Sequence, residues 1–131
     1  RSENVEKVLK KNFGKKIILI DRFTDSTIAY QHYGMGINLN LIKQLNKFIM
    51  NNFRPTFTFL NIVNKKNMKN RLNKRINLNR YDKFNFNFYN KVQKGFLKMA
   101  NNKNNYLIID SNKNNIEENY QIILKKIKKI I

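Results

Sequence analysis

Apolar residues along this chain follow two patterns, short continuous runs and stripes that repeat every three or four positions. The short runs occupy residues 17–20, 57–63 and 106–109, of which 57–63 is interrupted by Thr58 and Asn61. A short run that is apolar on both faces predicts a buried strand of a parallel sheet. The stripes predict helices between and around these strands, so we expect an α/β fold in which helices flank a parallel sheet.

The helical stripes also predict which helix faces are buried. The first helix contains Val5, Val8 and Leu9 and is expected to stop at Gly14, while the second should end before Pro55. We expect the lysines of the last helix on a solvated outer face rather than against a membrane. The inner faces expected for the later helices are Leu41, Ile42, Leu45, Phe48 and Ile49; Met68 and Leu72; Tyr89, Val92, Phe96 and Met99; and Ile116, Tyr120, Ile123, Leu124, Ile127 and Ile130.

The composition is strongly basic. The 131 residues carry a formal net charge of +19 and include 25 Asn, 21 Lys, 17 Ile and 6 Arg. Such a charge can indicate a nucleic-acid partner. However, the three abundant residue types all have AT-rich codons, and the lysines are spread from Lys7 to Lys129. Compositional drift therefore explains the charge better. A basic nucleic-acid-associated module stays as the alternative, and its binding would fall steeply with salt.

Scarce residue types exclude some classes of site. The chain has no Cys and a single His, which excludes a His/Cys structural zinc site and suits a cytoplasmic location. That histidine, His32, is expected at a helix end without an acid–base role. The longest aliphatic run, residues 17–20, is far too short to span a bilayer. The length suits one domain, residues 1–131, with one core.

Candidate chemistry follows the first predicted strand, because ligands of parallel sheets bind beyond the carboxyl ends of the strands. Residues 21–31 there are Asp-Arg-Phe-Thr-Asp-Ser-Thr-Ile-Ala-Tyr-Gln. Residues 24–26 have an ordinary explanation, since one of them is expected to cap the next helix. Capping does not account for Asp21 and Arg22. An arginine at this place can bind a phosphate bidentately beside a helix N-terminus.

This segment resembles the signature of thymidylate kinases, which continues here through residues 33–37. The resemblance implies a P-loop nucleoside monophosphate kinase fold and covers nearly the whole chain. It implies an enzyme that phosphorylates dTMP to dTDP with ATP and Mg²⁺ in dTTP synthesis. The further segments that match the family in order and spacing are residues 1–6, Arg54-Pro55 ahead of residues 58–60, residues 80–82 and residues 96–100.

The resemblance implies roles at the dTMP end of the site. Arg22 would bind the dTMP phosphate. Thr27 and Gln31 would face the thymine ring, because hydroxyl and amide groups can hydrogen-bond to the donors and acceptors along its edge. Tyr30 would line the deoxyribose and crowd a ribose 2′-hydroxyl, and Arg1 would approach the thymine carbonyl. For each residue, an ordinary polar surface role is the alternative.

The resemblance also implies a catalytic end. Asp21 would orient the phosphate-binding arginine or the Mg²⁺ shell, and no metal ligand is otherwise assigned in the chain. The basic segment of about residues 71–81 would form a lid over the ATP phosphates. Its Arg71, Arg75 and Arg80 would stabilise the charge that phosphoryl transfer spreads over the phosphate oxygens. A solvated basic loop is the alternative for this segment.

One motif of the family is missing from the chain. Its four glycines do not form the Gly-x-x-x-x-Gly-Lys-Ser/Thr loop that cradles ATP phosphates, which the family places before Arg1 with its strand. We therefore expect a fragment that is inactive alone. In the family that strand lies between those matching residues 17–20 and 57–62. Each backbone group left buried without a partner costs about 1–3 kcal/mol against a domain stability of about 5–15 kcal/mol, so we expect no stable isolated monomer.

Smaller departures from the family pattern put lid closure and metal positioning in question and leave the dTMP end intact. They leave two alternatives, drift in a working enzyme and decay into a non-functional remnant. The family further implies a homodimer, for which the helices starting at Arg1 and Leu41 are candidate surfaces. The departing positions are Met35, Thr56, Ile62 and Asn79.

Overall fold

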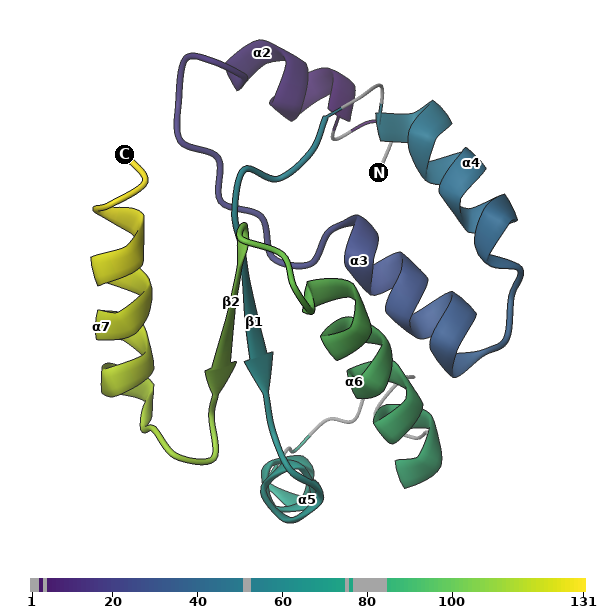
Figure 1. Ribbon diagram of the computed structural model, residues 1–131, viewed down its shortest axis with the longest axis vertical. Coiled ribbons are helices and arrows are strands. Elements are labelled where there is room, and N and C mark those ends of the chain that lie inside the picture. Colours follow the sequence, from purple (N-terminus) through teal and green to yellow (C-terminus); the bar gives the residue numbers. More distant parts are fainter. Residues whose placement is uncertain (1–2, 4, 51–52, 75, 77–84) are drawn as a thin grey trace. The chain divides into compact units, whose positions relative to one another are not determined.

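The computed structural model of the chain describes residues 3, 5–50, 53–74, 76 and 85–131 (Figure 1). The fold divides into two units, each of which is described by itself below. Unit 1 comprises Arg1–Thr56 and Lys91–Met99, and unit 2 comprises Phe57–Asn90 and Ala100–Ile131.

Unit 2 is built on two parallel strands, β1 (Thr58–Ile62) and β2 (Tyr106–Asp110), which pair from their first residues to their last (Figure 1). Successive side chains of a strand point to opposite faces, and accordingly Ile109 is 2% exposed whereas Ile108 is 42% exposed. The predicted parallel pairing is therefore confirmed for the second and third apolar runs.

Helix α5 (Lys65–Asn73) follows β1, and α7 (Ile116–Ile127) follows β2. Each begins at an asparagine that satisfies a helix N–H group. The Asn64 side chain accepts a hydrogen bond from the Asn67 backbone at 2.8 Å. At α7 the Asn115 side chain accepts from the Glu118 backbone at 2.9 Å, and the Glu118 carboxylate accepts from the Asn115 backbone at 2.8 Å. This reciprocal pair is a capping box.

We expect Asn115→Ala to lower the free energy of unfolding by about 1 kcal/mol, because it removes the side-chain acceptor of the cap. Urea unfolding of the protein expressed from its complete gene measures the change. The control is Asn104→Ala in an exposed turn, which should stay within about 0.5 kcal/mol of the parent protein. Equal losses from the two substitutions would contradict a specific contribution of the cap.

Unit 1 is mostly helical. Its N-terminal part has a π-helix η1 (Val5–Leu9) that runs into α2 (Lys10–Asn12), and Gly14 beyond it has φ of +75°. A glycine in this left-handed conformation ends a helix, as predicted. The next helical segment is α3 (Thr24–Thr27), which continues as a second π-helix, η2 (Ile28–Gly34).

Helix α4 (Leu39–Met50) contacts η2 and contributes to the core of unit 1. Helix α6 (Phe86–Ala100) supplies the remaining part of this unit, Lys91–Met99. Its predicted inner face is confirmed by Val92, which is 4% exposed. The core cluster comprises buried Val5, Leu9 and Met50, with Ile18, Phe23, Ile49 and Phe53 packed against it.

The strand predicted over residues 17–20 is wrong. This segment forms no strand, and Ile17, Leu19 and Ile20 are 65%, 81% and 47% exposed. Within the described part of unit 1, Ile18 is the one residue of this segment that meets the packing surface of the core cluster. A continuous apolar run thus predicts burial on two sides where the fold supplies one.

The predicted inner face of α4 is wrong in part. Ile42 is 2% exposed and Ile49 joins the core cluster, but Leu41, Leu45 and Phe48 are 50%, 52% and 87% exposed. The apolar residues of α4 extend around more than one side of the helix, and only one side packs within unit 1. These three exposed residues, spaced four and three apart, are called the α4 stripe below.

The apolar face predicted for the last helix is likewise only partly covered. Ile123, Leu124 and Ile127 are half-buried, whereas Ile116, Tyr120 and Ile130 are 90%, 54% and 39% exposed. The middle of the predicted face is therefore covered, and its two ends are exposed. Among the described helices, none has the length and apolar character that crossing a membrane requires.

Candidate functional site

The backbone turns sharply at Arg22. Its φ is +62°, in the left-handed region that side chains with a Cβ seldom adopt. This conformation costs roughly 1–2 kcal/mol, and such residues concentrate at functional sites. The turn joins the exposed extended segment of residues 17–20 to α3 and leaves the Arg22 side chain exposed.

The helix after this turn has no side-chain cap. Phe23 occupies the cap position, so the expectation that one of residues 24–26 caps the helix is wrong. Because of the strained turn at Arg22, the cap position falls on Phe23, one residue before Thr24, the first residue with a hydroxyl group. Asp25 lies in the first turn instead, where a negative charge is favoured by the helix dipole.

The same helix widens into the π-helix η2 within the predicted site. The Met35 N–H donates to the Tyr30 carbonyl at 3.0 Å, a bond between residues five apart. π-helical turns are rare and occur frequently at functional sites. His32 lies near the end of η2, as predicted, and its Nδ1 donates to the Ile37 carbonyl at 2.8 Å. The histidine therefore helps to close the turn after the helix.

Three side chains meet beside the Arg22 turn. The Arg22 Cζ atom lies 5.5 Å from the centre of the Tyr30 ring, over its face. The Tyr30 ring packs edge-on against Phe96 of α6, with centroids 6.4 Å apart and planes at 78°. All three residues belong to unit 1. Ala29, next to Tyr30, is fully buried and holds this part of the helix against the unit.

The structure brings five of the predicted site residues together in unit 1, within residues 21–31. Asp21, Arg22 and Gln31 are exposed, and Thr27 and Tyr30 are half-buried. Thr27 and Gln31 are four positions apart, which places them on one side of the helix. Arg1, Arg75 and Arg80 lie outside the described residues.

Arg71 belongs to unit 2, where it ties α5 to the loop after β2. Its Nη2 donates to the Ser111 carbonyl at 3.2 Å. Asn112 strengthens the same connection, because its side-chain oxygen accepts from the Asn64 backbone at 2.8 Å and from the Asn67 side chain at 3.1 Å. Sequence reasoning missed Asn112. The only sequence signal for it is its place just after a strand end, which its many asparagine neighbours obscure.

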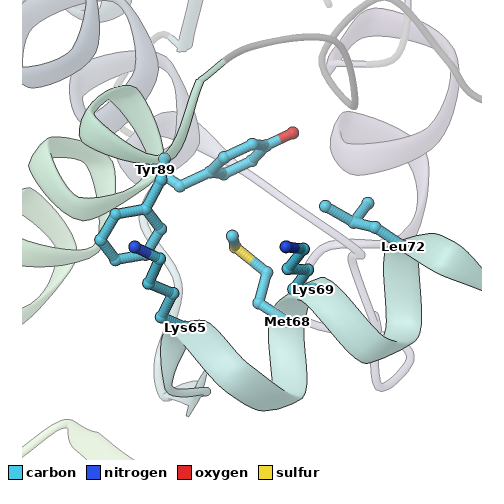
Figure 2. Close-up of a pocket in the computed structure, with 6 residues that line it drawn as sticks. Lys65, Met68, Lys69, Leu72 and Tyr89 are labelled. Carbon is cyan, nitrogen blue, oxygen red and sulfur yellow. The ribbon is translucent and has the colours of Figure 1, made fainter.

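A shallow hollow lies elsewhere in unit 2. Figure 2 shows side chains of α5 and Tyr89 of α6 around it, with Lys65 and Lys69 beside the apolar Met68 and Leu72. The Lys65 Nζ atom lies 4.4 Å from the ring centre of Phe86, which also lines the hollow. Its volume is about 160 Å³. Pockets for drug-sized ligands are roughly 300–1,000 Å³, so the hollow is smaller than such a pocket, and no ligand is assigned to it.

A family model for thymidylate kinase matches residues 1–123. The chain belongs to the thymidylate kinase family. Its relatives include the thymidylate kinase of Wolbachia sp. subsp. Brugia malayi (strain TRS), 41% identical over 104 residues that cover 79% of this chain and 49% of the relative. The thymidylate kinase of Trichodesmium erythraeum (strain IMS101) is 34% identical over 127 residues, covering 95% and 56%.

A solved thymidylate kinase from Ehrlichia chaffeensis superposes with a TM-score of 0.65 at 31% identity, covering 99% of this chain and 60% of that one. The expected α/β class of P-loop nucleoside monophosphate kinases is thereby confirmed. The chain spans about half the length of the curated thymidylate kinases it matches.

Thymidylate kinases use ATP, and the metal that accompanies ATP is generally Mg²⁺. The described residues contain no group of three or more His, Cys, Asp or Glu side chains that could hold a metal by themselves. Mg²⁺ usually takes only one or two protein carboxylates and fills its other positions with phosphate oxygens and water. The exposed Asp21 carboxylate, next to Arg22, fits such a metal.

Proposed function

We propose that this protein is a nucleoside monophosphate kinase that phosphorylates dTMP to dTDP with ATP. The observation that carries the proposal is the strained, exposed turn at Arg22 beside the start of a helix. Membership of the thymidylate kinase family supports the same function. A guanidinium presented in this way suits a nucleotide phosphate, because arginine binds phosphate bidentately and helix N-termini favour anions.

The dTMP end of the proposed site lies along α3 and η2. Arg22 binds the 5′-phosphate, and Thr27 and Gln31 present hydroxyl and amide groups to the thymine edge. Tyr30 lies beside the deoxyribose and excludes a 2′-hydroxyl, and Arg1 approaches the thymine carbonyl. The placement of four of these residues within one helical segment and its entry turn supports the assignment.

At the ATP end, Asp21 orients Arg22 or a water of the Mg²⁺ shell. Residues of about 71–81 form a cationic lid in which Arg71, Arg75 and Arg80 stabilise the phosphates. The bond from Arg71 to the Ser111 carbonyl is compatible with this role, because a guanidinium has five N–H donors and that bond uses one. Mg²⁺ would supply charge neutralisation at the transferred phosphate when bound.

We further propose that the protein is a homodimer. The α4 stripe supports this, because Leu41, Leu45 and Phe48 form a continuous exposed apolar row on one side of a helix. A second copy that presents the same row would cover it in a two-fold symmetric contact. The N-terminal helix that contains Val5 is the other candidate surface.

The test is dTMP-dependent formation of ADP by the protein expressed from its complete gene. We expect turnover with dTMP and much weaker turnover with UMP, whose 2′-hydroxyl would meet Tyr30. The reaction without a nucleoside monophosphate is the control. A folded protein that binds neither dTMP nor ATP would instead indicate a non-functional remnant, and salt-sensitive binding of generic DNA would favour the nucleic-acid alternative.

A further inference from the structure

The Arg22 guanidinium lies against an aromatic side chain. It lies over the face of Tyr30 at 5.5 Å, within the range of a cation–π contact. The Tyr30 ring also contacts Phe96, with the two ring planes at 78° in a T-shaped pair. Aromatic rings prefer this geometry because the positive edge of one ring faces the negative face of the other.

We infer that Phe96 is a positioning residue for Arg22 that acts through Tyr30; this rests on the proposed function, in which Arg22 binds the dTMP phosphate. In this role Phe96 contacts neither the guanidinium nor the reacting atoms. It fixes the Tyr30 ring, and the ring fixes the arginine. The three residues are called the Phe96 relay below.

The relay restricts the conformations of the Arg22 side chain. An exposed arginine has many rotamers, and each rotamer that is lost on binding reduces phosphate affinity. A guanidinium that already lies on an aromatic face loses fewer of them. The strained backbone at Arg22, with φ of +62°, fixes the start of the side chain, and the Tyr30 ring fixes its end. The relay therefore prepares the site before the substrate arrives.

The relay also separates phosphate affinity from nucleoside affinity. Thymidine lacks the phosphate, so its binding does not use the Arg22 guanidinium. Loss of Phe96 should weaken dTMP more than thymidine, because thymidine can lose only the contact of Tyr30 with the deoxyribose, whereas dTMP also loses the positioned guanidinium. If Phe96 only stabilised the fold around the sugar and base, both ligands would weaken together. The ratio of the two dissociation constants therefore tests positioning rather than stability.

The experiment measures dTMP and thymidine dissociation constants by calorimetry for the complete protein and for Phe96→Leu. We expect Kd for dTMP to rise about twofold to fivefold more than Kd for thymidine, the range that loss of one exposed cation–π contact gives. Tyr30→Phe keeps a ring beneath the guanidinium and should keep the affinity ratio. Tyr30→Leu removes the ring and should raise Kd for dTMP at least as much as Phe96→Leu.

Phe88→Leu is the matched control. Phe88 is on the same helix, is 8% exposed and forms its own edge-on pair with Tyr89 at 5.8 Å, but it lies outside the relay. We expect this substitution to lower the melting temperature without changing the ratio of dTMP to thymidine affinity. A ratio that falls equally in Phe88→Leu and Phe96→Leu would overturn the inference.

A second readout needs no substrate. An aromatic face shifts nearby protons upfield, so the Arg22 side-chain resonances, assigned with Arg22→Lys, should be shifted in the ligand-free protein and return towards ordinary values in Phe96→Leu. Unshifted Arg22 resonances in the parent protein would overturn the relay. A parent protein that shows the shift but binds no dTMP would overturn the proposed function and leave the relay as a structural contact.

Discussion

Replacement of Arg22 by alanine in the complete protein is expected to raise the dissociation constant for dTMP about a hundredfold. The substitution removes a bidentate, charge-assisted contact, and two hydrogen bonds to a charged group are together worth roughly 3 kcal/mol. Thymidine affinity should stay within twofold of the parent protein. Calorimetric titration with the two ligands measures both values.

Arg54→Ala is the matched control for this prediction. Arg54 is another exposed arginine of unit 1, but no site role is assigned to it. The Arg54→Ala substitution reduces the net charge by the same amount as Arg22→Ala, so any general electrostatic loss of dTMP binding appears in both variants. An unchanged dTMP affinity in Arg22→Ala, or an equal loss in Arg54→Ala, would remove the central contact of the proposed site.

Replacement of Arg22 by glycine is expected to affect protein stability and dTMP affinity in opposite directions. Glycine adopts positive φ without the steric cost that a Cβ imposes. Arg22→Gly should therefore keep or slightly raise the melting temperature while it loses dTMP affinity as Arg22→Ala does. This combination would show that the strained turn at φ of +62° is retained for the arginine side chain rather than for the fold.

Gly95→Ala is expected to lower the free energy of unfolding by about 1–3 kcal/mol. Gly95 lies in α6 against Tyr33 of η2, and a Cβ added there would be 2.6 Å from the Tyr33 Cγ atom and 2.9 Å from its Cβ. These Tyr33 atoms are close to the backbone and cannot move away by a rotation of the far end of the side chain. Thermal unfolding of the protein measures the loss.

A double-mutant cycle separates this clash from other effects of the substitution. In the Tyr33→Ala background the two ring contacts are gone, and only the Cβ atom of residue 33, at 2.9 Å, remains close to the added methyl. Alanine is also the better helix former by roughly 1 kcal/mol, so Gly95→Ala should cost clearly less in this background than in the parent protein. A similar loss in both backgrounds would show that the close approach to Tyr33 is not what requires glycine.

The positions of the helices could be predicted from the sequence because helical periodicity is a local signal. The stripe containing Val92 and Phe96 marks α6, and the row from Leu41 marks α4. The stop at Gly14 also followed from one residue, since a left-handed glycine ends a helix in many contexts. These features depend on neighbours within one or two turns of chain.

Burial was predicted less well, because it depends on which surface each side chain meets. The run at residues 17–20 and the α4 stripe are as apolar as buried segments are. Ile17 and Phe48 are nevertheless 65% and 87% exposed. No periodicity distinguishes an apolar face that packs from one that does not. The capping expectation failed for a related reason, since the turn at Arg22 determines where the helix begins.

The sequence by itself determined the α/β class, the positions of strands β1 and β2, and the segment from Asp21 to Gln31 that marks the family. Only the tertiary structure decided that Arg22 adopts a left-handed turn, that its guanidinium lies over Tyr30, and that Phe96 supports that ring. In the sequence Phe96 is one apolar residue of a helical stripe. Its contact with Tyr30 arises when folding brings two distant helical segments together, and local patterns carry no signal for such a meeting.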